Sequence, residues 1–90
     1  MEYDGIKSQV EQLIKENKNI VLIGSGGNGK SYLVNSLGNL FNSKKYYIFH
    51  EYNEAVEKLN NYVLCVNSMS ELSRLNKDSY VLIDMNHLAF

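Results

Sequence analysis

Residues 24–31 read GSGGNGKS and combine four glycines with one lysine and two serine hydroxyls. The apolar run IVLI precedes this stretch, and a segment with apolar residues at helical spacing follows it. Glycines allow the backbone to curl so that several N–H groups converge on one anion at the start of a helix. The pattern G-x-x-x-x-G-K-S between a strand and a helix therefore predicts a phosphate-binding loop. A side chain at any of the four glycines is expected to obstruct this curl: Gly24, Gly26, Gly27 and Gly29.

The other residues of the loop have separate expected tasks. Lys30 would bring a positive charge to the β- and γ-phosphates of a nucleotide, and Ser31 would offer a hydroxyl ligand to Mg²⁺. Asn28 would donate from its side chain toward the γ-phosphate or an attacking water. Tyr32, like Tyr3, either stacks on a base or belongs to aromatic core packing, and the sequence leaves both open. The predicted nucleotide-binding residues are Gly26, Gly27, Asn28, Gly29, Lys30, Ser31 and Tyr32.

A second candidate for the site is Asp84, which follows four apolar or aromatic residues at the end of a predicted buried strand. Ligands of open α/β sheets bind at the carboxyl ends of strands, so Asp84 and the glycine loop are expected to face one crevice. There Asp84 would hold Mg²⁺ through the water shell of the ion, with Ser31 as the other predicted metal ligand. The alternative is a strand-terminal aspartate that enters a turn, and the presence of the loop favours the metal site.

Hydrolysis of a bound triphosphate needs a positioned water and positive charge on the transferring group. Glu51 and Glu54 follow the predicted strand 46–50 and are the candidates for orienting the water. Glu51 is preferred, because it would lie at the carboxyl end of that strand. With Lys30 and Asp84 it forms the predicted catalytic set. A solvated acid at a helix N-terminus is the alternative interpretation of Glu51. Arg74, the single arginine, is expected to form a surface salt bridge rather than to reach a neighbouring subunit's phosphate, so hydrolysis should be slow.

The chain around these residues alternates between helical and strand patterns, which predicts an α/β fold with a mainly parallel sheet. About four strands and about four helices are expected, in three layers with helices on both faces of the sheet. His50 is expected to lie half-buried at the end of its strand. The predicted strands are 20–23, 46–50, 62–66 and 80–84, and the predicted helices are 5–17, 30–41, 53–61 and 68–77.

The bulk properties of the chain indicate one small domain over residues 1–90. The net charge of −1 and the pI of about 6.1 give no basic field, so nucleic acid is a weakly supported partner. Cys65 is the single cysteine and is expected to be a buried, inert thiol, which fits a reducing compartment. No apolar run approaches the roughly 18 residues that span a bilayer. We therefore expect a cytoplasmic protein with no membrane partner, or, for a viral protein, the host cytoplasm or the virion.

The strand, glycine loop and helix resemble those of P-loop NTPases, with a Walker A motif at 24–31 and a Walker B motif at 80–84. The finer resemblance is to the core of the superfamily-three helicases of viruses and mobile elements, and residues 20–43 and 62–86 carry it. It implies a minimal P-loop αβα sandwich and an ATP site with Mg²⁺. The family usually has two adjacent acids at Walker B, whereas Met85 follows the acid here. The resemblance implies a nucleotide site and does not imply a working helicase.

Taken together, the sequence predicts a minimal domain that binds ATP or another nucleoside triphosphate with Mg²⁺ and hydrolyses it slowly. One alternative is a nucleotide sensor or interaction module without catalysis. Another is a helicase-derived protein associated with nucleic acid. A small-molecule phosphotransferase is disfavoured, because a single arginine cannot build an arginine-rich lid over the phosphates. A homo-oligomer or a larger protein partner is compatible with each of these functions.

Overall fold

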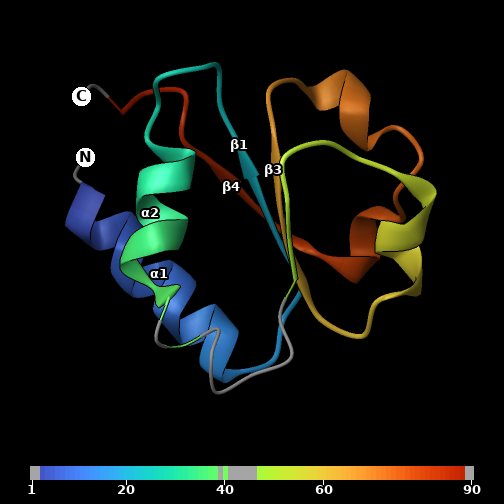
Figure 1. The fold of residues 1–90 in the computed structure, drawn as a ribbon, viewed down its shortest axis with the longest axis horizontal. Coiled ribbons are helices and arrows are strands. Elements are labelled where there is room, and N and C mark those ends of the chain that lie inside the picture. Colours follow the sequence, from blue (N-terminus) through green and yellow to red (C-terminus); the bar gives the residue numbers. More distant parts are fainter. Residues whose placement is uncertain (1–2, 39, 41–46, 89–90) are drawn as a thin grey trace.

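The computed structural model describes residues 3–38, 40 and 47–88, and its centre is a sheet of four parallel strands (Figure 1). The order across the sheet is β2-β3-β1-β4. In this register Ile23, the last residue of β1, lies opposite Val66 on one side and Asp84 on the other. The carboxyl ends of these strands therefore share one edge of the sheet. The strands are β1 (Ile20–Ile23), β2 (Tyr47–Phe49), β3 (Tyr62–Val66) and β4 (Val81–Asp84).

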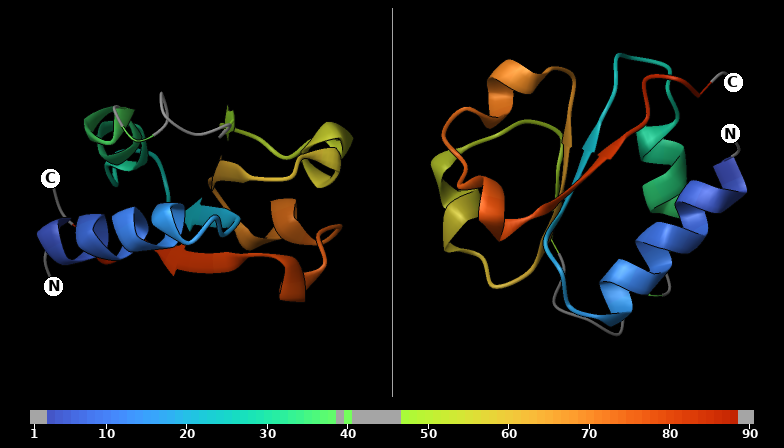
Figure 2. Two further views of the ribbon diagram at one scale, coloured as in Figure 1. Left: turned by 90° about the horizontal axis from the view of Figure 1, so that it is seen from below. Right: turned by 180° about the vertical axis from the view of Figure 1, so that it is seen from behind.

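Two α-helices, α1 (Tyr3–Lys15) and α2 (Lys30–Ser36), cover one face of this sheet (Figures 1 and 2). The buried face of α1 consists of residues at helical spacing, namely Ile6, Val10 and Ile14. They join Leu22 and other alternate strand residues in one hydrophobic cluster, which we call the helix-side core. This core fixes α2, and with it the loop that enters α2, against the sheet.

The opposite face of the sheet is covered by three short 3-10 helices: η1 (Glu54–Lys58), η2 (Met69–Leu72) and η3 (Lys77–Ser79). Val21 and Leu64 point into this second cluster, the turn-side core, together with Val56 from η1. Every residue of β1 and of β3 is buried, because both faces of these central strands are covered. The fold is thus a small α/β structure with three layers (Figure 2).

The number of α-helices differs from the sequence prediction. In the part of the chain that the structure describes, the predicted helices 53–61 and 68–77 are replaced by 3-10 helices of at most five residues. The side chain of Asn53 accepts a hydrogen bond from the N–H of Ala55, and Asn76 likewise accepts from Asp78. Both asparagines cap the start of a short 3-10 helix, and segments this short cannot offset the cost of α-helix nucleation.

The remaining differences concern boundaries. The second predicted helix, 30–41, and the second predicted strand, 46–50, extend partly outside the described residues. Within the described ranges, no helix has the length and apolar character needed to cross a membrane.

Candidate functional site

The glycine loop connects the end of β1 to the start of α2, at the edge where the parallel strands end (Figure 1). Gly27 and Gly29 have φ angles of 87° and 83°, in the left-handed region that glycine adopts without strain. At Gly24 an added Cβ would lie 2.8 Å from Oδ1 of Asn28, so the loop packs too closely for a side chain. At Gly26 an added Cβ would meet nothing within 4 Å. The expected obstruction is therefore seen at three glycines, and at Gly26 the structure shows open space instead.

Lys30, the first residue of α2, turns its side chain back over the loop. Its Nζ donates to the carbonyl oxygen of Gly24, to that of Ser25 at 3.3 Å, and to Oδ1 of Asn67 at 3.4 Å. Asn67 directly follows β3, the strand beside β1. All three acceptors are neutral, so these contacts leave the charge of the ammonium group uncompensated.

A cleft of about 410 Å³ opens above this loop and contains all seven residues that the sequence predicts to bind a nucleotide. Its far wall is formed by residues that follow β2 and belong to or follow β3: His50, Glu51, Cys65 and Asn67. The cleft thus joins the carboxyl ends of three neighbouring parallel strands. This is the position at which ligands bind in open α/β sheets.

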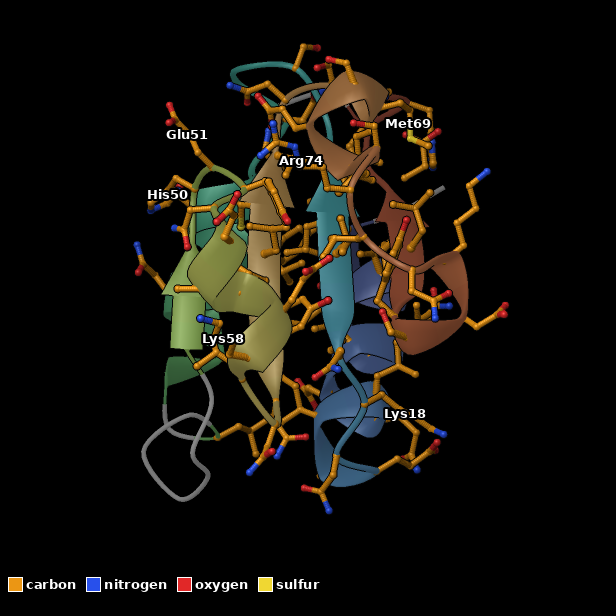
Figure 3. All side chains as sticks on the ribbon, turned by 90° about the vertical axis from the view of Figure 1, so that its right-hand side faces the viewer. Lys18, His50, Glu51, Lys58, Met69 and Arg74 are labelled. Carbon is orange, nitrogen blue, oxygen red and sulfur yellow. The ribbon has the colours of Figure 1, made fainter. Side chains whose placement is uncertain are left out.

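Glu51 and His50 both line the cleft and are exposed, and Figure 3 shows them next to each other. The expectation that His50 is half-buried is wrong, because the chain has already left β2 at Phe49. Glu51 stands where an acid could face a ligand held by the loop. Arg74 lies outside the lining of this cleft and pairs with Glu54 at 3.4 Å, with both side chains mostly exposed, as predicted for a surface salt bridge.

Asp84 ends β4 at the same edge of the sheet, as predicted, but the structure does not bring it into the lining of the cleft. Its carboxylate accepts a hydrogen bond from the N–H of Asn86 at 2.8 Å. This is the geometry of the turn that the sequence offered as the alternative. Among the described residues there is no group of three or more His, Cys, Asp and Glu side chains placed to hold a metal ion. A metal site shared by Ser31 and Asp84 therefore stays a prediction.

Two side-chain hydrogen bonds tie the loop to residues 84–88, a segment that we call the C-terminal strap. Oδ1 of Asn86 accepts from the N–H of Ser25 at 3.0 Å. The buried side chain of Asn28 accepts from the Ser25 hydroxyl at 3.1 Å and donates to the carbonyl of Leu88 at 3.3 Å. One of the two amide N–H groups of Asn28 is therefore used within the protein.

Sequence reasoning did not find Asn67 or Asn86 as parts of the site. Asn67 directly follows β3, and Asn86 lies just beyond the end of β4. The loop contacts both residues because β3 and β4 flank β1 in the sheet. The only signal was an asparagine just beyond a predicted strand. That signal becomes informative once the strand order is known.

Cys65 is buried at the base of the cleft, as predicted. Burial raises the pKa of its thiol from 9.0 to about 11, and the nearby Lys30 acts in the opposite direction with a smaller effect. The thiol is therefore protonated at neutral pH. Because the thiolate is the reactive form, this supports the interpretation of Cys65 as a packing residue.

Tyr32 is 62% exposed and lines the cleft beside Ser31. The prediction left open whether this ring belongs to the core, and its exposure shows that it does not. Its centroid lies 5.4 Å from that of Tyr3, with 54° between the ring planes. Tyr32 thus forms an aromatic wall at one end of the cleft.

Comparisons with known proteins give no further identification. No family model, no curated protein and no solved structure matches the chain. The function is therefore argued from the geometry of the cleft.

The arrangement provides hydrogen-bond donors and positive charge on one wall of the cleft. Within the described part of the chain, the main-chain N–H groups of Gly26, Gly27 and Gly29 have no protein acceptor. Lys30 adds an ammonium group, and Ser31 adds an exposed hydroxyl. Unpaired donors beside a cation bind an oxyanion, and the acid Glu51 on the other wall can accept a proton or orient a water molecule.

Proposed function

We propose that the cleft binds the phosphates of a nucleoside triphosphate, as the resemblance to P-loop NTPases implies, and that the domain hydrolyses this ligand slowly. The observation that carries this proposal is the loop itself. Two left-handed glycines, the open space at Gly26 and the side chain of Lys30 lie in the lining of one cleft, where the main-chain N–H groups of the three glycines lack a protein acceptor. A small anion suits this cleft better than a nucleic-acid backbone, since Lys30 is the only Lys or Arg among the described residues that line it.

Magnesium would bind together with the triphosphate. Ser31 presents an exposed hydroxyl in the cleft next to Lys30, and Mg²⁺ is commonly held by one or two protein oxygens, phosphate oxygens and water. The residues present fit such an ion with Ser31 as the direct ligand. Asp84 lies outside the lining of the cleft, so it would act on this ion only through the water shell. When bound, Mg²⁺ would neutralise part of the charge on the phosphate oxygens.

Binding is tested by a thermal-shift titration with ATP and with inorganic tripolyphosphate, each with Mg²⁺. A ligand at 100 times its Kd adds about 2.7 kcal/mol to the free energy of unfolding, which is large for a domain of this size. We expect the wild type and the control Lys77→Ala, whose lysine lies in η3, to be stabilised, and Lys30→Ala to lose most of this effect. Equal melting of the wild type with and without both ligands would remove the proposal.

Hydrolysis is tested by phosphate release from Mg²⁺–ATP. Glu51→Gln should lower the rate at least about 10-fold while binding is kept, because the amide cannot take the proton of the attacking water. Glu54→Gln is the matched control, since Glu54 is an exposed acid three residues away that pairs with Arg74 outside the cleft.

Binding without turnover is the second candidate function, and the position of Asp84 favours it. Its carboxylate accepts a hydrogen bond in a turn, and within the described part of the chain Glu51 is the only acid that lines the cleft. In this case Glu51→Gln and the wild type would release phosphate equally slowly while both are stabilised by ATP. The same pair of measurements thus separates the enzyme from the sensor.

A further inference from the structure

We propose that Tyr32, braced by Tyr3, is the surface on which the base of the bound nucleotide stacks, so that the cleft selects purine nucleoside triphosphates over free polyphosphate. This inference rests on the proposed function and adds the contact that recognises the base. It starts from the position of one ring. Tyr32 is the most exposed large hydrophobic side chain in the described structure, at 62%, and it lines the same cleft as the glycine loop.

The position of Tyr32 in α2 places its ring close to the phosphate-binding residues. Lys30, Ser31 and Tyr32 are consecutive in the first turn of α2, and all three line the cleft. A ligand anchored at Lys30 and Ser31 therefore reaches Tyr32 without leaving this cleft. An exposed aromatic ring gives a base a π-face on which to stack, whatever hydrogen bonds the base carries.

The ring of Tyr32 is held in place by a second ring. Tyr3 packs against it with a centroid distance of 5.4 Å and a tilt of 54°, within the range of favourable aromatic pairs. The Tyr3 hydroxyl lies 2.9 Å from the hydroxyl of Ser36, which in turn donates to the carbonyl of Leu33 at 2.7 Å. Tyr3 is thereby fixed between α1 and α2. A ring held in this way loses less conformational freedom when a base stacks on it.

Stacking also predicts which bases bind best. A purine covers more of a tyrosine ring than a pyrimidine does, so ATP and GTP should bind more tightly than CTP and UTP. Little difference between ATP and GTP is expected from the stack itself, because both bases offer a large π-face. The chemical class of ligand is therefore a purine nucleoside triphosphate.

The test compares three ligands with Mg²⁺, namely ATP, CTP and inorganic tripolyphosphate, on the wild type, Tyr32→Ala and Tyr32→Phe. Loss of one base stack should weaken ATP binding about 5- to 150-fold in Tyr32→Ala. Binding of tripolyphosphate should stay within about twofold of the wild type, because the phosphate contacts remain. Tyr32→Phe keeps the ring and should bind ATP like the wild type. His50→Ala, which removes another exposed ring from the cleft, is the control and should have the smaller effect.

A spectroscopic measurement separates stacking from a structural role of Tyr32. The H8 proton of bound ATP should shift upfield in the wild type through the ring current of Tyr32, and this shift should vanish in Tyr32→Ala. If Tyr32→Ala weakens ATP and tripolyphosphate equally, or if the wild type binds both equally tightly, the inference is overturned while the phosphate site stands. If the wild type binds none of the ligands, the proposed function fails and this inference fails with it.

Discussion

Gly27 and Gly29 hold the loop at positive φ angles of 87° and 83°, and Gly26 lies between them and the strand without such an angle. A residue with a Cβ occupies the left-handed region at a cost of about 1–2 kcal/mol. The requirement for glycine at 27 and 29 therefore comes from the fold. At Gly26 the fold leaves the Cβ position open, and a bound phosphate would give the reason for glycine there.

Substitution of these glycines by alanine separates folding from binding. Gly29→Ala should lower the free energy of unfolding by about 1–2 kcal/mol because of its φ angle. Gly26→Ala should leave it within about 0.5 kcal/mol, yet weaken tripolyphosphate binding, because its methyl group would occupy the open space above the loop. Chemical denaturation and a binding titration on both variants measure the two effects. A Gly26→Ala protein that binds like the wild type would show that phosphate does not occupy this space.

The buried thiol of Cys65 makes a pH-dependent contribution to stability. Burial raises its pKa from 9.0 to about 11 in the folded chain, so below pH 9 the thiol is protonated in both the folded and the unfolded state. Above pH 9 the unfolded chain releases this proton first, which favours unfolding. The contribution is therefore fully present below pH 9 and is lost by about pH 11, with a total of about 2–3 kcal/mol.

The variant Cys65→Ala isolates this effect from the other titratable groups, which are the same in both proteins. The difference in free energy of unfolding between wild type and Cys65→Ala should be constant up to about pH 9. Between pH 9 and 11 it should change by about 2–3 kcal/mol in favour of the variant. Urea denaturation at pH 8 and pH 11 is sufficient to measure it. A difference that stays constant would mean that the thiol is solvated in the folded protein.

At the scale of elements, the C-terminal strap makes the loop depend on β4. Met85 donates its N–H to the carbonyl of Ile23 at 2.7 Å, and the side chain of Asn86 accepts from Ser25. Asp84 fixes the turn that presents Asn86. An acid at the end of β4 can therefore affect the loop through Asn86, without contact with a ligand.

Asn86→Ala should remove one of these ties. We expect a loss of about 0.5–1.5 kcal/mol in stability, faster hydrogen exchange at the Ser25 amide and weaker tripolyphosphate binding, because the loop is then less rigid. Asn76→Ala is the control, since Asn76 accepts a comparable bond from Asp78 in η3, outside the cleft. It should cost similar stability without a change in binding. Equal binding by both variants would show that the strap is not needed to shape the loop.

The parts of the fold and site that could be predicted are those that depend on residues adjacent in the sequence. The loop and its Lys30 and Ser31 were found because the motif is contiguous, and the strands because their apolar runs are short and bounded. The 3-10 helices were missed because N-cap residues such as Asn53 and Asn76 also begin α-helices, so the sequence signal is the same for both. The contacts of Asn67 and Asn86 depend on strand order, which neither composition nor spacing determines.

At the scale of the whole molecule, one sheet separates two hydrophobic cores. The helix-side core contains Val10 and the turn-side core contains Val56, and both side chains are fully or almost fully buried. Alternate residues of β1 and β3 take part in the two cores. Loss of either layer would therefore expose one apolar face of these two central strands. We therefore expect the described structure to unfold as one cooperative unit.

Val10→Ala and Val56→Ala test this expectation on opposite faces. Each should lower the free energy of unfolding by about 1–3 kcal/mol, because each leaves a small cavity in a closed core. Unfolding followed by circular dichroism and by tyrosine fluorescence should coincide for both variants, and the denaturant m-value should match that of the wild type. A Val56→Ala protein with two separate transitions would mean that the turn-side layer unfolds independently.

The strand order also has a consequence for synthesis on the ribosome. The strand that leads into the glycine loop, β1, is translated before both of its partners in the sheet, β3 and β4. The hydrogen bond from the N–H of Gly24 can form only after Val66 has been translated. The hydrogen bond from the N–H of Ser25 can form only after Asn86 has been translated. A nascent chain whose residues 84–88 have not yet left the ribosome therefore carries the complete glycine motif without the hydrogen bonds that shape the loop. A nucleotide that binds this loop would then stabilise the chain only after residues 84–88 have been translated.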